Sequence, residues 1–122
     1  MLNRPQRVAE AIREALQSIF QYEVHDPRLP AIFTITRVNV PKDLRSAKAY
    51  FSLLPDDEES INQAEEMLHD CKGFVRMRMA EDVNLKFAPE LFFEYDPGEK
   101  NFQKVSAKLN QIRRDDEKRQ KS

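Results

Sequence analysis

The sequence predicts an α+β domain in which helices cover one side of a three-stranded β-sheet. Three observations carry this prediction. Apolar residues recur at three- and four-residue intervals in residues 4–22 and 58–85, two segments between them alternate with a period of two, and an aromatic segment follows at 89–95. A chain of 122 residues suits one such domain, because domains commonly hold about 100–150 residues.

The first helix is predicted over residues 4–22. Its apolar positions lie three or four residues apart: Val8, Ala11, Ile12, Ala15, Leu16, Ile19 and Phe20. Pro5 suits the first turn of a helix. We expect the segment from Asp26 to Pro30 to end this helix, because proline lacks an amide donor and disfavours helix in the residue before it.

Residues 32–40 and 46–53 predict two strands of an antiparallel hairpin, joined by a turn at 41–44. Strict alternation divides the first strand into two faces, with Ile32, Thr34, Thr36, Val38 and Val40 on one and Phe33, Ile35, Arg37 and Asn39 on the other. In the second strand it divides Ala47, Ala49, Phe51 and Leu53 from Lys48 and Tyr50.

A further helix is predicted after the acidic residues 56–59, because negative charge stabilises a helix N-terminus. Gly73 interrupts the helical pattern, and we expect a kink there that starts another helix. The apolar residues assigned to these two helices are Ile61, Ala64, Met67 and Leu68, then Phe74, Met77, Val83 and Leu85. The alternative is one continuous helix from Glu58 to Val83 in which Gly73 is an ordinary interior residue.

The chain ends with a third strand at 89–95, a turn at 96–99 and a short C-terminal helix. The apolar stripe of that helix is Phe102, Val105, Leu109 and Ile112. Residues 113–122 contain no apolar residue, so we expect a disordered charged tail. The order is therefore α-β-β-α-kink-α-β plus the short helix, in one domain spanning residues 1–112.

Composition narrows the class of protein. The mean hydropathy of -0.71 argues against a membrane span of about 20 apolar residues, and the first residues do not form a secretory signal, so we expect a cytoplasmic protein. Cys71 is the only cysteine, and His25 and His69 are the only histidines. No internal disulfide, metal or cofactor is therefore expected.

The net charge of -1 hides a strong partition along the chain. Residues 1–54 carry eight Lys or Arg against five Asp or Glu, residues 55–70 carry none against seven, and residues 71–122 carry twelve against nine. Screening limits each charge to about 8 Å at physiological salt, so local charge governs phosphate attraction. The two basic segments permit RNA binding.

Five segments in order resemble the ribosome-binding factor A family. They are residues 23–29 (EVHDPRL), 34–40 (TITRVNV), 43–52 (DLRSAKAYFS), 73–76 (GFVR) and 89–93 (PELFF). The resemblance covers residues 1 to about 112. Each segment alone is weak, and the five together are specific.

The resemblance implies a type II K-homology fold whose two central helices meet at an Ala-x-Gly kink. Here the three residues are Cys71, Lys72 and Gly73, and cysteine is small enough that we expect the kink to persist. The resemblance also implies a non-catalytic factor that binds the immature small (30S) ribosomal subunit and its rRNA. It implies assistance in 16S rRNA maturation, including 5′-end processing, and a role in growth at low temperature. We expect a monomer that takes no small-molecule substrate and does not bind a membrane.

Candidate RNA contacts surround the expected kink, because glycine lets a ligand approach the backbone and a new helix start offers amides to phosphate. These candidates are Lys72, Gly73, Arg76 and Arg78, and the alternative for them is a solvated helix face. Further candidates lie elsewhere in the chain: Arg4, Arg7, Arg28, Arg45, Lys48 and Lys86. For Arg28 the alternative is an ion pair with Asp26. Tyr50 could also contact RNA, and its alternative is burial as a core residue.

No catalytic site is expected. His25 beside Asp26 lacks a nucleophile, and Cys71 is expected to be buried as a small apolar residue. The alternative function is a protein-interaction adaptor of small α+β fold that does not bind RNA. The salt dependence of binding distinguishes the RNA-binding factor from the adaptor, because affinity that depends on phosphate contacts falls steeply as the salt concentration rises.

Overall fold

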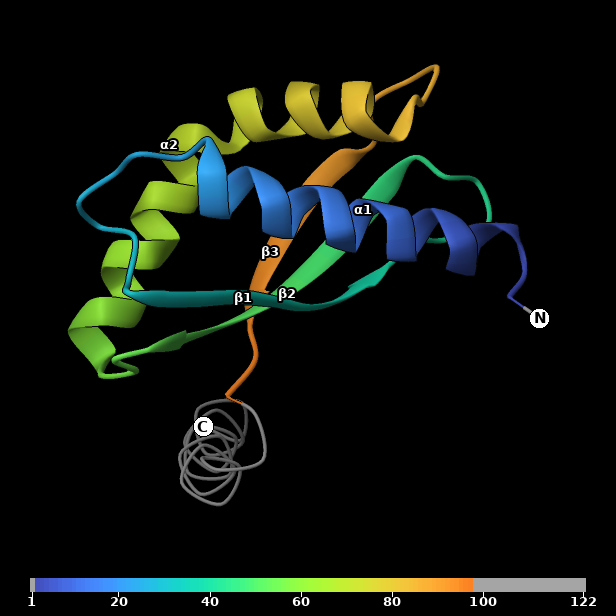
Figure 1. Cartoon of the computed structure of the whole chain (residues 1–122). Coiled ribbons are helices and arrows are strands. Elements are labelled where there is room, and N and C mark those ends of the chain that lie inside the picture. Colours follow the sequence, from blue (N-terminus) through green and yellow to red (C-terminus); the bar gives the residue numbers. More distant parts are fainter. Residues whose placement is uncertain (1, 98–122) are drawn as a thin grey trace, which may run out of the picture.

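The computed structural model describes residues 2–97, which form two helices on one face of a three-stranded sheet (Figure 1). The central strand β2 is antiparallel to β1 and parallel to β3. This is the expected α+β architecture. In chain order the elements are α1 (Arg4–Tyr22), β1 (Ile32–Asn39), β2 (Ser46–Leu54), α2 (Glu58–Val83) and β3 (Glu90–Tyr95).

Helix α1 begins with a capping box. The Asn3 side chain accepts from the Gln6 amide at 2.9 Å, and the Gln6 side chain accepts from the Asn3 amide at 3.0 Å. The helix ends at Tyr22, four residues before Asp26, so the proline segment follows a short connection and does not itself stop the helix. The stripe facing the sheet is buried as predicted, with Ile12, Leu16, Ile19 and Phe20 at its centre.

Strand β1 departs from strict alternation because it contains a β-bulge. Ile35 pairs with Phe51 of β2, whereas Arg37 pairs with Tyr50, so the register shifts by one residue at Thr36. The prediction that Arg37 shares a face with Phe33 and Ile35 is therefore wrong. The buried residues of the strand are Phe33, Ile35 and Val38, and Arg37 is exposed.

The core is built on the buried face of β2. Ala47, Ala49, Phe51 and Leu53 are all at most 3% exposed, as the alternation predicted. The Phe33 ring packs against Phe20 of α1 and Phe51 of β2, with centroid separations of 4.9 Å and 5.5 Å. These aromatic contacts join α1 to two strands of the sheet.

Helix α2 is continuous from Glu58 to Val83, and Figure 1 shows that its axis changes direction partway along. The expected kink is thus a bend within one helix. Gly73 lies inside it without a left-handed backbone conformation, and a Cβ atom added there would meet nothing within 4 Å. Asp57 caps the N-terminus by accepting from the Ser60 amide, and Asn84 ends the helix with a φ of 58°.

The buried stripe of α2 runs through Gly73 without a change of phase. Leu68, Val75 and Met79 face the core. The prediction that Phe74 and Met77 are buried is wrong, because it assumed a kink that resets the helical phase. Their side chains are 52% and 61% exposed.

Several expectations lie outside the described residues. These are the C-terminal helix with its stripe from Phe102 to Ile112, the boundary at residue 112 and the tail at 113–122. Within residues 2–97, neither helix has a stretch that is long and apolar enough to cross a membrane.

Replacing Gly73 with Ala should stabilise the domain by about 0.5–1 kcal/mol, because the helical backbone and open surroundings accept a Cβ and alanine loses less entropy in a helix. Thermal unfolding should show a melting temperature raised by about 2–6 °C. The matched control is Gln63→Gly, an exposed position in the same helix, which should lower it. A melting temperature lowered by Gly73→Ala would contradict this description of the bend.

Candidate nucleic-acid interface

Charge in the folded domain is distributed unevenly: cations gather at one end, beside Asp43 and Glu90, and carboxylates predominate at the other. The start of α1, the β1–β2 turn and the α2–β3 loop lie at one end, and the acidic start of α2 lies at the other (Figure 1). We call the first of these the basic end. It presents five exposed cations: Arg4, Arg7, Lys42, Arg45 and Lys86. Among the described residues, none of the five forms an ion pair with a carboxylate.

The start of α1 and the β1–β2 turn border a common groove at the basic end. Arg4 lines it from the helix and Lys42 from the turn. The turn is held in a sparsely populated conformation, since Leu44 has a φ of 57°. Its backbone is fixed by two hydrogen bonds, from the Leu44 amide to the Pro41 carbonyl and from the Arg45 amide to an Asp43 carboxylate oxygen. Lys42 and Arg45 are thus presented by a rigid turn.

Backbone hydrogen bonds connect this turn to the entry of β3. The Glu90 amide donates to the Arg45 carbonyl at 2.9 Å. Arg76 of α2 donates from its guanidinium to the carbonyls of Ala88 and Pro89, at 2.8 and 3.0 Å. Arg76 therefore fastens α2 to the loop before β3. No carboxylate of residues 2–97 forms a salt bridge with it, so its positive charge adds to the basic end.

Two predicted contact residues have intramolecular partners. Arg28 donates to both carboxylate oxygens of Asp26 and, at 2.8 Å, to Asp70 of α2. Arg78 donates to Glu23 at 2.7 Å and to Glu81 at 3.1 Å. Side-chain hydrogen bonds raise the pKa of Arg78 and of Arg28, so both stay charged. The geometry gives these arginines a structural role, because carboxylates balance their charge.

The remaining candidates lie on β2 and in the middle of α2. Lys48 projects from β2 and pairs with Glu94 of β3 at 3.0 Å. The ammonium of Lys72 lies 5.1 Å from the ring centroid of Phe92. Gly73 is on the exposed side of α2, next to the exposed Phe74. The structure thus divides the predicted set into three groups, and of the four candidates expected around the kink it places Arg76 against the α2–β3 loop and Arg78 beside Glu23.

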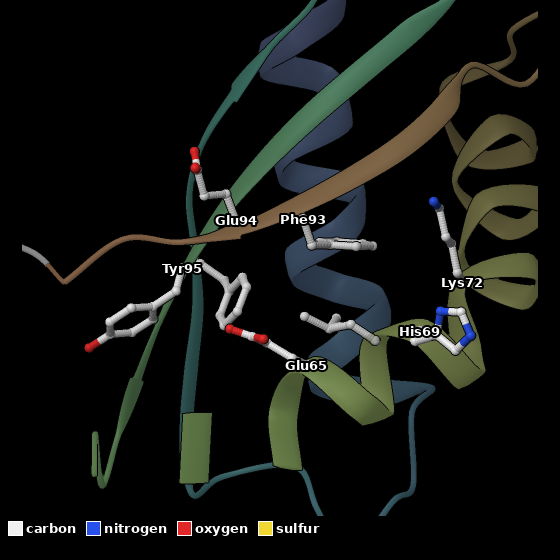
Figure 2. A pocket seen from close by; sticks show the side chains of 8 residues that line it. Glu65, His69, Lys72, Phe93, Glu94 and Tyr95 are labelled. Atoms are coloured by element: carbon white, nitrogen blue, oxygen red, sulfur yellow. The ribbon is translucent and has the colours of Figure 1, made fainter. Parts of the chain in front are cut away.

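A hollow of about 300 Å³ lies between α2 and β3. Figure 2 shows Phe93 pointing from β3 toward α2, whereas Glu94 points to the opposite side of the strand. Glu65, His69 and Lys72 line the hollow from α2. Glu65 brings negative charge to this hollow, so its electrostatics suit phosphate less well than those of the basic end.

Two functional candidates were missed from the sequence. Lys42 stands in a turn that the sequence marked clearly, and a count of cations in predicted turns would have found it. Arg37 was placed on the same face as Phe33 and Ile35, because nothing in the sequence marks the bulge at Thr36. In the structure its guanidinium carbon lies 4.0 Å from the centroid of the Tyr50 ring.

The groups that suggested chemistry do not assemble into a reactive site. Burial raises the pKa of the Cys71 thiol, which disfavours the nucleophilic thiolate despite the adjacent Lys72. His25 is exposed, and its neighbour Asp26 is engaged by Arg28. Within residues 2–97, no group of His, Cys, Asp and Glu side chains is placed to hold a metal ion.

Comparison with known proteins identifies the family. A family model described as ribosome-binding factor A matches residues 4–109. This chain belongs to the ribosome-binding factor A family. A relative of that name from Acetivibrio thermocellus is 41% identical over 95 residues, covering 78% of this chain and 76% of the relative. Another from Marinomonas sp. is 37% identical over 117 residues, covering 94% and 90%.

Solved structures of the family share the fold. The crystal structure of ribosome-binding factor A from Thermus thermophilus is 20% identical with a TM-score of 0.64, covering 76% of this chain and 97% of that one. The solution structure of a Thermotoga maritima protein is 35% identical with a TM-score of 0.57, covering 77% and 84%. A homology model of the Thermus thermophilus factor, fitted into a cryo-EM map of its 30S complex, is 22% identical with a TM-score of 0.59, covering 75% and 92%. The architecture is thus that of the family, with its K-homology-like fold.

The pairing of Arg28 with Asp26 makes a prediction about acid stability. Hydrogen bonds from Arg28 lower the pKa of Asp26 to about 2, well below the value of about 3.9 expected in the unfolded chain. A pKa that is lower in the folded chain than in the unfolded chain stabilises the fold at pH values above the unfolded pKa. This stabilisation is lost as the pH falls from about 4 toward 2.

Asp26→Asn should therefore lower the midpoint of urea unfolding at pH 7 and reduce its fall between pH 4 and pH 2. The control is Asp43→Asn, a carboxylate in the β1–β2 turn that forms no salt bridge within residues 2–97. If the urea midpoint of Asp26→Asn falls between pH 4 and pH 2 as much as that of the unsubstituted protein, the role of this pair is contradicted.

Proposed function

We propose that this chain binds the immature small ribosomal subunit and assists maturation of its 16S rRNA, including processing of the 5′ end. The observation that carries the proposal is membership of the ribosome-binding factor A family over residues 4–109. The Thermus thermophilus factor, which shares the fold, has been fitted into a complex with the 30S subunit. The protein acts in the cytoplasm as a monomeric binding factor without a catalytic step or a small-molecule substrate.

The basic end is the surface that we assign to rRNA phosphates. Its cations come from three parts of the chain that the fold brings to one end of the sheet, at Arg4, Lys42 and Lys86. Because none of them forms an ion pair with a carboxylate of the described residues, their charge is available to a polyanion. Contacts of this kind position a protein on RNA without reading its sequence.

The acidic end has the opposite effect. The N-terminal half of α2 and its cap carry Asp57, Glu58, Glu59, Glu65 and Glu66 without a cation on the same segment. Repulsion from phosphate turns this half of the molecule away from rRNA. The separation of charge therefore orients the protein, although its net charge is close to zero.

The double substitution Arg4→Gln with Lys42→Gln should weaken binding to small subunits, because it removes two cations from one groove. In sedimentation with purified subunits, the slope of log affinity against log salt should become shallower by about one for each phosphate that is no longer neutralised. Melting temperature should stay within about 2 °C, since both side chains are exposed.

The matched control is Arg13→Gln on the same helix, whose charge is paired with Glu10. It should bind with nearly unchanged affinity and salt slope. Equal losses for the control and the double variant would remove the assignment of the basic end. Binding that does not depend on salt would instead favour a protein-interaction adaptor.

A further inference from the structure

The face of the sheet opposite the helices carries an ordered set of aromatic and cationic side chains. The register places Arg37, Tyr50 and Glu94 side by side across the three strands. In the next row, Lys48 is flanked by Asn39 and Phe92. Figure 2 shows Glu94 projecting on this side of β3, away from α2. We call these six residues, together with Lys72, the open-face cluster.

Cations lie over both aromatic rings of the cluster. The Arg37 guanidinium carbon is 4.0 Å and the Lys48 ammonium 5.3 Å from the Tyr50 ring centroid. Lys72 reaches from α2 to within 5.1 Å of the Phe92 centroid, and Phe92 is 46% exposed. Three cations thus contact the two rings. Glu94 is the carboxylate that pairs with one of them, Lys48, at 3.0 Å.

The β-bulge at Thr36 is what brings Arg37 to this face. Without it, alternation would point Arg37 into the core beside Phe33 and Ile35. Bulges re-aim side chains and are common beside functional sites. The sequence thus combines a buried Val38 with an exposed cation directly opposite Tyr50, at the cost of a local break in the ladder.

We propose that the open-face cluster is a second RNA-binding surface, which stacks bases of single-stranded RNA on Phe92 and on the Arg37–Tyr50 pair. Aromatic rings and guanidinium planes are the groups on which unpaired bases stack, and nearby cations bind the backbone between them. Three cations beside two rings and one paired carboxylate give this face a charge that complements an RNA backbone. The inference rests on the proposed role on rRNA and adds a surface that adjoins the basic end at Asn39, which also lines the groove between Arg4 and Lys42.

The test is an NMR titration of the isotope-labelled full chain with a uridine decamer, set beside a duplex of ten base pairs. Resonances of Tyr50, Phe92 and Arg37 should shift with the single strand and not with the duplex. Phe92→Ala should weaken decamer binding by about tenfold, and Tyr50→Ala by a similar factor, whereas Tyr50→Phe should keep most of the affinity. The control Tyr22→Ala, an exposed tyrosine at the end of α1, should bind as the unsubstituted chain does.

Glu94→Gln gives a test with the opposite sign. It releases Lys48 from its ion pair, so decamer affinity should rise by about twofold or more. Decamer affinity unchanged by Phe92→Ala and by Glu94→Gln would overturn the proposal. So would a loss of subunit binding in Phe92→Ala with decamer binding intact, because the face would then dock a ribosomal protein. Decamer binding at this face by a chain that does not sediment with subunits would support the proposal and remove the function proposed above.

Discussion

The pairing of β2 with both of its neighbours is the constraint that sets the other features of the domain. One face of this central strand is buried from Ala47 to Leu53, where Ala47, Ala49, Phe51 and Leu53 are at most 3% exposed. Because a strand alternates strictly, that burial commits Lys48 and Tyr50 to the opposite face. The core and the open face are therefore set by the same register.

Within residues 2–97, the folded chain divides the cations of the domain into a paired and an unpaired set, which the sequence alone does not distinguish. Arg28 and Arg78 connect segments that are distant in sequence, to Asp70 and to Glu23 respectively. Partly exposed pairs of this kind contribute modestly to stability, yet they leave little positive charge for a ligand. The cations at the start of α1 and in the hairpin turn carry no such pairing among the described residues. Family membership and this division of charge together support a factor that is positioned on rRNA electrostatically.

The sequence predicted those parts of the fold that depend on local periodicity. The buried stripe of α1 and the alternation of β2 follow from residue spacing alone, and both are confirmed. The bulge in β1 was missed because it results from cross-strand pairing, and this error hid Arg37. Phe74 and Met77 were misplaced because Gly73 was taken to break the helical phase, whereas α2 continues through it. The ion pairs of Arg28 with Asp70 and of Arg78 with Glu23 span 42 and 55 residues, so only the tertiary structure reveals them.

The proposed binding mode brings the basic end and the open face of the sheet to rRNA, with the acidic half of α2 turned away. Ultraviolet crosslinking of the protein to small subunits from its own source, followed by mass spectrometry of the crosslinked peptides, tests this binding mode. We predict nucleotide adducts on peptides that contain the start of α1, the turn at Lys42 and the strands at Tyr50 and Phe92. Adducts confined to peptides from the first half of α2, between Glu58 and Asp70, would contradict it.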